Sequence, residues 1–457
     1  MQRRFLVILG VVSAALSLPA TAAAADTIVF ENVRVLTMTE AGTLPSATVV
    51  VTDGSITSVG EAPADLPDDA VRVDGSGKTL MPGLADMHVH YFSSNEGPMF
   101  LANGVTTVRN LWGTAQTFAL DATNKAGTTA GPHIYTSGPL MDGPNPIWGE
   151  GSVKITEPEQ VVGAVESQRA VGFKAIKLYE GLTPEIYRAA VAAARERNMQ
   201  VWTHTPEDMT VEEVINLEVD SIEHFEDVSD FVYEATGDDD DAGYFERWAN
   251  ADPERMQAIA DLSAEKGVWH SPTYAVIAKR YEYGAEPDAF FDLPESGYVG
   301  PFLADWWRGS ASRMTPYDDV KIAAAERQRE LIKTLYDAGA SLLIGTDTPN
   351  PFVLPGFAIH DELAAFVEAG LPVQDVLRIA TADAARFLRE DDQWGVITAG
   401  ARADLVLLDG DPLVDLATLR QPAGVMVNGL WYDEDRLAFE LAAAKERLAQ
   451  PAPEAGE

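Results

Sequence analysis

The chain has 457 residues, and its 71 Asp and Glu side chains outnumber its 33 Lys and Arg side chains, which gives a formal net charge of -38. Nucleic acid and anionic lipid would be repelled by this charge, so neither is expected as a partner, and the acidity is interpreted as a solubility feature. The 46% hydrophobic content is sufficient for the core of a barrel-sized domain, and the absence of cysteine excludes disulfides.

Residues 1–25 have the pattern of a secretory signal peptide. Two arginines precede the apolar run Phe5 to Leu18, and small residues, Ala22 to Ala25, follow it. The run is shorter than the roughly 20 apolar residues of a membrane-spanning helix, and no later stretch reaches that length. We expect cleavage before Asp26, a periplasmic or secreted mature protein, and no membrane partner.

Both ends of the remaining chain predict parts of one small β domain. Residues 26–80 form short apolar bursts separated by Gly, Asp and Pro, which is typical of antiparallel strands. Ala403 to Leu408 and Gly424 to Gly429 have the same character. We therefore expect a β-sandwich domain built from residues 26–80 and 391–440, followed by a C-terminal helix or tail over 441–457.

Residues 81–390 show a different pattern, in which eight strand-like runs alternate with amphipathic helical segments. This alternation is the signature of an α/β fold with a parallel (β/α)8 barrel, or TIM barrel. The runs are Leu84 to His90, Gly104 to Asn110, His133 to Ser137, Phe173 to Leu178, Gln200 to His204, Ser221 to His224, Val268 to Thr273 and Leu342 to Asp347. Residues 228–266 and 280–320 exceed ordinary connections and are expected to form helical lids beside the site.

The carboxyl ends of these runs carry metal-ligand side chains, and this is where the chemistry of such barrels lies. His88 and His90 are two residues apart on a strand, so they face the same side and can bind one metal ion. Further candidate ligands end four other runs: Lys177, His204, His224 and Asp347. A lone pair of histidines is weak evidence, but ligand types at five strand ends predict a metal centre.

Lys177 is the informative member of this set. A protonated ammonium cannot bind a metal and is costly to bury among cations, so Lys177 must lose its charge. One route is reaction with carbon dioxide to a carbamate, an anionic oxygen ligand able to bridge two metals. Lys174 has the opposite strand parity and should point away from the barrel mouth. The alternative is an ordinary salt-bridge lysine at position 177.

Together these motifs resemble the amidohydrolase superfamily of metal-dependent hydrolases. The motifs are HxH after PGLADM, a lysine at the fourth strand, histidines at the fifth and sixth, GTD at the eighth, and the closing phrase Gly400 to Leu408. The resemblance covers nearly the whole mature chain. Within the superfamily, the chain resembles the secreted branch that contains Xaa-Pro dipeptidases and imidazolonepropionase-like enzymes.

The resemblance implies a binuclear site with two divalent metal ions, expected to be zinc, although the ligands also suit manganese, cobalt or iron. The implied ligands are His88, His90 and Asp347 for one ion, His204 and His224 for the other, and carbamylated Lys177, formed with CO2, together with a hydroxide for both. Two cations would lower the pKa of the shared water. Asp347 would then be the catalytic proton shuttle.

Four further residues are candidate substrate contacts: His270, Tyr179, Arg109 and His360. His270 lies in the seventh run, with a buried structural role as the alternative, and Tyr179 follows the metal lysine closely. Arg109 ends the second run, where it could bind a substrate carboxylate or form a salt bridge. His360 begins a predicted helix, where capping or packing is the alternative. His133 begins the third run, away from the mouth, and is expected to be structural.

The first functional hypothesis is hydrolysis of an amide bond in a small-molecule substrate, either a dipeptide or an N-acyl amino acid. Lactone or phosphotriester hydrolysis would use the same site and stays open. An aminohydrolase or imidazolone-type ring hydrolase is a third reading, against which Lys177 speaks. A catalytically dead periplasmic binding protein is the alternative from another class, and the proton shuttle Asp347 speaks against it. A homo-oligomer is compatible with the sequence.

One loop departs from the family pattern. Many dipeptide-cleaving relatives have a glycine- and histidine-rich loop after the third strand, whereas this chain has Gly138 to Trp148. Peptide specificity is therefore open. The indoles of Trp148, Trp306 and Trp307 indicate either an aromatic-walled pocket or core packing.

Overall fold

The computed structural model describes residues 27–225, 228–233, 242–312 and 318–450. The expected signal peptide lies outside these ranges. Among the helices described, none combines the length and the apolar character needed to cross a membrane.

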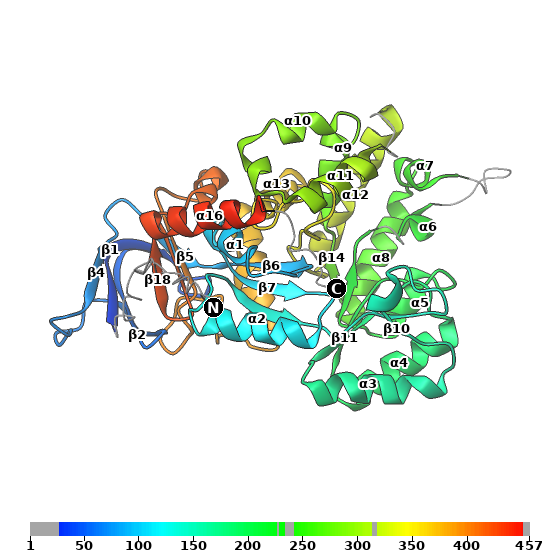
Figure 1. The fold of residues 1–457 in the computed structure, drawn as a ribbon, viewed down its shortest axis with the longest axis horizontal. Coiled ribbons are helices and arrows are strands. Elements are labelled where there is room, and N and C mark those ends of the chain that lie inside the picture. Colours follow the sequence, from blue (N-terminus) through cyan, green and yellow to red (C-terminus); the bar gives the residue numbers. More distant parts are fainter. Residues whose placement is uncertain (1–26, 226–227, 234–241, 313–317, 451–457) are drawn as a thin grey trace, which may run out of the picture.

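Strands from both ends of the chain form one sheet, at the left in Figure 1, with the order β18-β17-β16-β5-β1-β2-β3 and with β4 beside β1. The strands are β1 (Thr27–Leu36), β2 (Thr43–Thr52), β3 (Ser55–Gly60), β4 (Val71–Asp74), β5 (Thr79–Pro82), β16 (Leu405–Leu408), β17 (Gly424–Val427) and β18 (Leu430–Asp433). The two ends join in the antiparallel pair β5 and β16, where Leu405 lies opposite Pro82. We expected a two-layer sandwich, but all strands described in this region belong to a single hydrogen-bonded sheet.

Two tight hairpins of this sheet depend on residues with positive φ. Asp53 and Gly54 have φ of 49° and 74° between β2 and β3, and Asn428 and Gly429 have φ of 56° and 73° between β17 and β18. Asp-Gly and Asn-Gly pairs tolerate this backbone and suit two-residue hairpins. A Cβ on Gly54 would lie 3.2 Å from the Cα of Gly429, so the turns from opposite ends of the chain abut.

The middle of the chain supplies two parallel sheets, whose orders are β6-β7-β8 and β10-β9-β11-β12-β13-β14-β15. The strands are β6 (Leu84–Val89), β7 (Val105–Asn110), β8 (His133–Thr136), β9 (Met141–Asp142), β10 (Val153–Lys154), β11 (Ala175–Leu178), β12 (Gln200–Thr203), β13 (Ser221–Glu223), β14 (Trp269–Ser271) and β15 (Ser341–Leu342). In Figure 1, β6 and β7 point away from the terminal sheet, so their carboxyl ends lie on the side opposite to it.

Backbone contacts link both sides of the smaller sheet to the larger one. Ser137, directly after β8, forms a parallel bridge with Ala175 in β11, and Val89 in β6 forms another with Thr348, beyond the short β15. Near the second bridge, the Asp347 N–H donates to the carbonyl of His88 at 2.7 Å. The carboxyl end of the eighth expected run therefore lies beside that of the first.

Helices follow the parallel strands and pack on their outer side. They are α1 (Gly97–Ala102), α2 (Ala115–Lys125), α3 (Glu159–Val171), α4 (Pro184–Glu196), α5 (Val211–Asn216), α8 (Pro253–Lys266), α12 (Asp319–Asp337), α13 (Ile359–Glu368), α14 (Val373–Arg378) and α15 (Ala384–Phe387). In α4, Thr183 caps the first turn and Pro184 occupies the first helical position, where its missing N–H costs nothing. Its buried side chains recur at helical spacing, which fixes one face against the strands.

The two expected lid segments are mostly helical where they are described. They contain α6 (Ser229–Val232), α7 (Tyr244–Ala249), α9 (Tyr274–Tyr283), α10 (Pro287–Phe291), the 3-10 turn Pro294–Tyr298 and α11 (Pro301–Ala311). The C-terminal helix α16 (Glu434–Leu448) begins before the expected boundary at residue 441, because the Asp433 side chain accepts the N–H of Arg436 and caps it there. It lies across the molecule beside α1.

Candidate metal centre

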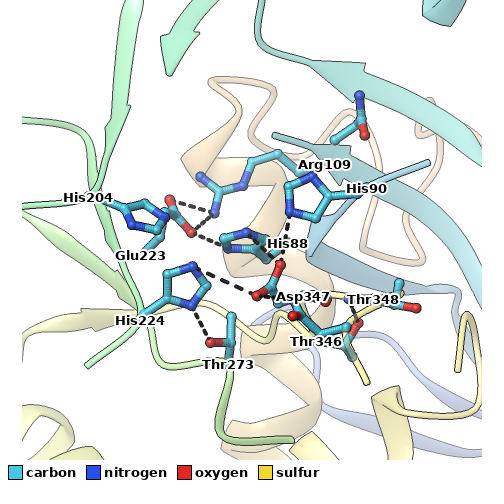
Figure 2. Close-up of polar contacts among 12 residues, drawn as sticks. His88, His90, Arg109, His204, Glu223, His224, Thr273, Thr346, Asp347 and Thr348 are labelled. Atoms are coloured by element: carbon cyan, nitrogen blue, oxygen red, sulfur yellow. Dashed lines mark hydrogen bonds and ion pairs between the residues drawn. The ribbon is translucent and has the colours of Figure 1, made fainter. Parts of the chain in front are cut away.

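The predicted metal ligands come together at the carboxyl ends of the parallel strands. Figure 2 shows the rings of His88, His204 and His224 and the carboxylate of Asp347 gathered in one place. The ring centroids of His88 and His224 are 4.7 Å apart, and those of His204 and His224 are 4.6 Å apart. Residues separated by more than 250 positions in the sequence thus share one polar pocket.

The Asp347 carboxylate is the centre of this group. Its Oδ1 lies 3.3 Å from His88 Nε2 and 3.0 Å from His90 Nε2, and its Oδ2 lies 3.9 Å from His224 Nε2. One ligand atom from each of His88, His90 and Asp347 lies within 4.8 Å of the others. These three donors therefore face a common point that one cation could share.

Three of the histidine rings are held by a partner on the nitrogen that faces away from the common point. His88 Nδ1 lies 2.9 Å from Glu223 Oε2, and His204 Nδ1 lies 2.7 Å from Glu180 Oε1. His224 Nδ1 lies 2.6 Å from the Thr273 hydroxyl. Metal-ligating histidines are usually oriented in this way, through the ring nitrogen that does not bind the ion.

Burial is the main influence on the titration of these rings. It lowers the pKa of His204 and of His224 well below the ordinary value, and it lowers the pKa of His90 although Asp347 opposes the shift. Burial also acts to lower the pKa of His88, but the carboxylates of Asp347 and Glu223 outweigh it and raise that pKa. Neutral imidazoles with a free lone pair result at three of the four positions.

Lys177 lies in the same pocket without a hydrogen-bond partner. Its side chain is buried, and Nζ is among the buried polar atoms of the described residues that contact no acceptor. Burial, assisted by Arg109, lowers the pKa of Lys177 to about 8, while Glu223 and Asp347 oppose the shift. Lys174 is exposed, as its strand parity predicts. An amine with so low a pKa is readily neutral and nucleophilic.

Glu223 joins the centre to a buried arginine, and its role was missed at the level of sequence. Its two carboxylate oxygens accept hydrogen bonds from Arg109 Nη2 at 2.9 and 2.7 Å, and the Ser221 hydroxyl also donates to it. Figure 2 shows the carboxylate between the guanidinium and the ring of His88. The available signal was a glutamate that ends a buried strand, directly before a candidate ligand.

The geometry corrects the expected substrate contact of Arg109. The side chain is fully buried, and its guanidinium lies 4.9 Å from the ring of Trp202 and 4.8 Å from the ring of Phe387. Its Nε donates to the carbonyl of Met87, and its remaining donors reach Ser221 and Glu223. No face of the group is open to a substrate carboxylate. The salt-bridge alternative is what the structure shows.

Two more of the expected substrate contacts are also buried away from the mouth. His270 Nε2 lies 2.8 Å from the hydroxyl of Ser263 in α8, outside the strands, and burial lowers the pKa of His270 to about 4. His360 Nε2 lies 3.1 Å from the Asn103 side chain, and burial lowers the pKa of His360 to about 3. Both rings pack between elements, so their predicted substrate contact is corrected. Tyr179 differs, since its ring lies 4.4 Å from that of His204.

Two further polar side chains, also missed from the sequence, position Asp347. Asn350 Nδ2 donates to Asp347 Oδ2 at 2.7 Å and to the Asp347 carbonyl at 3.0 Å. Asp86 is buried on β6, two residues before His88, and accepts hydrogen bonds from the N–H and the hydroxyl of Thr346. Burial raises the pKa of Asp86 to about 7. These contacts fix both the side chain and the backbone of the eighth run.

Three residues at the mouth adopt backbone conformations that side chains usually avoid. His224, Thr273 and Asp347 have φ of 67°, 51° and 58°. Left-handed conformations at non-glycine residues cost roughly 1–3 kcal/mol each and persist where the surroundings determine them. Here they turn the side chains at the ends of three runs toward the common point.

The residues present fit a divalent metal centre. Imidazole nitrogens and a carboxylate are ligands that suit zinc and its neighbours, and His204 and His224 use Nδ1, not Nε2, for the contacts to Glu180 and Thr273. The unpartnered Nζ of Lys177 is a buried polar atom that the protein alone leaves unsatisfied. A ligand from outside the chain would resolve this imbalance.

Comparison with known proteins places the chain among hydrolases. Residues 79–431 match the profile of the Amidohydrolase family. The sequence is similar to ochratoxinase of Aspergillus niger, with 23% identity over 447 residues that cover 84% of this chain and 81% of the relative.

Two solved structures are similar over nearly the whole chain. The fold is similar to that of a bottromycin amidohydrolase, with a TM-score of 0.76 and 25% identity, over 93% of this chain and 91% of that one. It is also similar to that of a Xaa-Pro dipeptidase with methionine bound in its active site, with a TM-score of 0.65 and 21% identity, over 89% of this chain and 100% of that one.

Proposed function

The chain belongs to the amidohydrolase family, a family of hydrolases acting on carbon–nitrogen bonds, and from this premise we propose that it cleaves an amide bond in a dipeptide or an N-acyl amino acid. The similarity to a protein named as an amidohydrolase, at 25% identity over most of both chains, supports the amide class. So does the similarity in fold to a Xaa-Pro dipeptidase.

One observation carries the proposal. Four histidines, one aspartate and one unpartnered lysine from five strand ends share a single pocket. A structural core has no need of a buried amine without an acceptor, because that atom loses hydrogen bonds to water and gains none. A catalytic centre that modifies the lysine and binds cations would use every member of the set.

The proposed metal ligands are those that the family resemblance implies, and the grouping of His88, His90 and Asp347 supports the first ion. His88, His90 and Asp347 would hold one ion, His204 and His224 would hold the second, and Lys177 would contact both as a carbamate. The neutral amine of Lys177 would attack CO2, forming one N–C bond as one C–O π bond of CO2 breaks, with the amine proton released to solvent. When bound, two divalent ions supply Lewis-acid activation of a water and of the substrate carbonyl.

The protein side chains supply the proton transfers. Asp347 would accept a proton from the attacking water and deliver it to the leaving amine, and the hydrogen bond from Asn350 Nδ2 to its Oδ2 at 2.7 Å supports this role by fixing the carboxylate. Glu180 and Thr273 keep the rings of His204 and His224 in one orientation throughout. Because these partners are already in place, little reorganisation is required during the reaction.

We also infer that the two parallel sheets form one closed (β/α)8 barrel, because bridges join both edges of the smaller sheet to the larger one. The sequence pattern of residues 1–25 leads us to propose in addition that the enzyme acts outside the cytoplasm. Its partners there would be small-molecule substrates.

The test is amine release from a panel of dipeptides and N-acyl amino acids by zinc-loaded protein, with Asp347→Asn as the blank. Release that depends on Asp347 is expected. If no amide releases an amine, and lactones or phosphotriesters are hydrolysed in a reaction that depends on Asp347, the amide assignment is overturned. The substrates of this site would then be lactones or phosphotriesters.

A further inference from the structure

Exposed aromatic side chains line one wall of the metal centre. Phe92 is 52% exposed and Trp148 is 46% exposed, although both lie near buried ligands. The ring centroid of Trp112 lies 5.9 Å from that of Phe92 and 5.6 Å from that of Trp148. Isolated exposed aromatics need no explanation, but a contiguous group beside an active site marks a surface that binds something.

This aromatic wall, formed by Phe92, Trp112, Trp148 and Tyr179, connects the two halves of the metal centre. Trp112 lies 6.4 Å from the ring of His90, and Phe92 stacks on the same ring at 6.2 Å. At the other end, the Trp148 indole N–H donates to the Tyr179 hydroxyl at 2.8 Å, and the Tyr179 ring lies 4.4 Å from His204. A substrate held at the metals would therefore pass along these rings.

The loop that carries Trp148 is built to hold its position. The buried carboxylate of Asp142 accepts three backbone N–H groups, from Gly143 at 2.8 Å, Ile147 at 3.0 Å and Gly181 at 3.0 Å. A Cβ on Gly143 would lie 1.7 Å from the carbonyl oxygen of Gly181, so only glycine allows this approach. The loop is thereby tied to the turn that follows the Lys177 strand.

Trp112 is fixed to the far end of the same loop. Its indole N–H donates to the Gly151 carbonyl at 3.1 Å, and a Cβ on Gly151 would lie 2.3 Å from the indole ring. Both indole N–H groups thus have partners within the protein. What remains open is the π surface, which favours flat or apolar groups.

We propose that the aromatic wall is a specificity subsite, which accepts an aromatic or bulky apolar group of the amide substrate. This inference rests on the proposed function and names the substrate class for the same centre. The nearby carboxylate of Glu180 is engaged by His204 at 2.7 Å, so ring faces, and not a free charge, are what the wall offers. The preferred substrates are amides of aromatic acids or aromatic amino acids.

The experiment compares matched amides, N-acetyl-phenylalanine against N-acetyl-alanine and N-benzoyl-alanine against N-acetyl-alanine, on zinc-loaded protein. We expect the wild-type protein to have a higher kcat/KM for at least one of the two aromatic amides than for N-acetyl-alanine. Trp148→Ala should lower kcat/KM for that aromatic amide about tenfold, mainly by raising KM. The loss for N-acetyl-alanine should be smaller, so that the ratio of kcat/KM between the aromatic and the aliphatic substrate falls. The control is Phe439→Ala, which removes a 63% exposed aromatic from α16.

A second measurement separates this subsite from the proposed reaction. Calorimetric binding of 3-phenylpropionate and of propionate to the same proteins requires no turnover. A preference for the aromatic acid that Trp148→Ala removes and Phe439→Ala keeps would support the subsite, even if no amide is cleaved and the proposed function fails. Amide hydrolysis with equal rates and equal binding for aromatic and aliphatic ligands would overturn the subsite and leave the proposed function standing.

Discussion

Two buried aspartates lie at opposite ends of the parallel strands and have opposite surroundings. Asp404, where the terminal sheet meets the amino ends, contacts Arg402 Nε at 2.6 Å and His133 Nε2 at 3.2 Å. Asp347, at the carboxyl ends, contacts only imidazoles and the amide of Asn350 among the partners described for its side chain. The pKa of each carboxyl is lowered, because nearby positive or potentially positive groups outweigh burial.

The difference lies in what balances the charge. Arg402 is a permanent cation, so the charge of the Asp404 carboxylate is balanced within the chain, and the contact with His133 joins the terminal sheet to the strands. At the mouth, burial favours neutral rings at His204 and His224, and it leaves the Nζ of Lys177 without an acceptor. At the amino ends the carboxylate has a permanent counter-charge, whereas at the carboxyl ends a buried amine has no acceptor among the described residues.

The largest effect is expected from Lys177→Ala. Removing the side chain proposed to contact both ions should release at least one metal per chain and reduce amide hydrolysis to background. Metal content by mass spectrometry and turnover of the best substrate measure this. The matched control is Lys174→Ala, directly before the same strand and exposed, which should retain both metals. Two metals and full turnover in Lys177→Ala would refute the carbamate assignment.

The next effect separates the two aspartates directly. Asp347→Asn should keep substantial metal but lower kcat by about 10²–10⁴-fold, because the proton acceptor is lost. Asp404→Asn should do the reverse, lowering the free energy of unfolding by about 1–3 kcal/mol through its weakened contacts while turnover per folded molecule is retained. Rates and denaturant unfolding are measured for both. Identical behaviour of the two variants would erase the proposed contrast between the ends.

Glu223→Gln tests whether metal binding depends on the contact by which Glu223 orients His88. The substitution keeps the shape of the side chain but removes the charge that orients His88 and balances Arg109. Loss of such an orienting partner typically weakens metal affinity by about 10–100-fold. Competition with a chelator measures the affinity, and thermal unfolding reports the cost of the unbalanced guanidinium. Unchanged metal affinity would reduce Glu223 to a structural partner of Arg109.

Much of this centre could be predicted from the sequence, because the local pattern of residues shows where each strand ends and which side chains lie there. The alternation of runs and helices, the spacing of His88 and His90, and the opposite parity of Lys174 and Lys177 all depend on neighbouring residues. The side chains of the predicted ligands accordingly meet in one pocket. The family profile over residues 79–431 agrees with the motif resemblance.

The errors arose where long-range packing decides what a side chain contacts. Arg109 ends a strand, yet it is enclosed by Glu223, Trp202 and Phe387, which are distant in sequence. His270 lies in a predicted strand, but its parity directs the ring to α8 instead of the mouth. Neither partner can be identified from local pattern, and the same applies to the contact between Asn350 and Asp347.

The smallest expected effect is the pH dependence of carbamate formation on Lys177, which tests whether the carboxyl ends of the strands require a ligand from outside the chain. Carbamate forms only from the neutral amine, and burial lowers the pKa of Lys177 to about 8. Between pH 7 and 8, at constant dissolved CO2, the reactive fraction rises from about a tenth to about a half, so loading of metal-free protein should accelerate about fivefold. The measurement is the rate at which activity appears after zinc and CO2 are added, with a labelled-carbon carbamate signal as the second readout. The pKa of Lys177 in the folded chain lies below its value of 10.5 in the unfolded chain, so the unfolded chain binds more protons at this group between about pH 8 and 10.5. The contribution of Lys177 to the free energy of unfolding of the metal-free protein therefore rises with pH in this range. Loading that ignores both pH and CO2 would mean that Lys177 acts without modification.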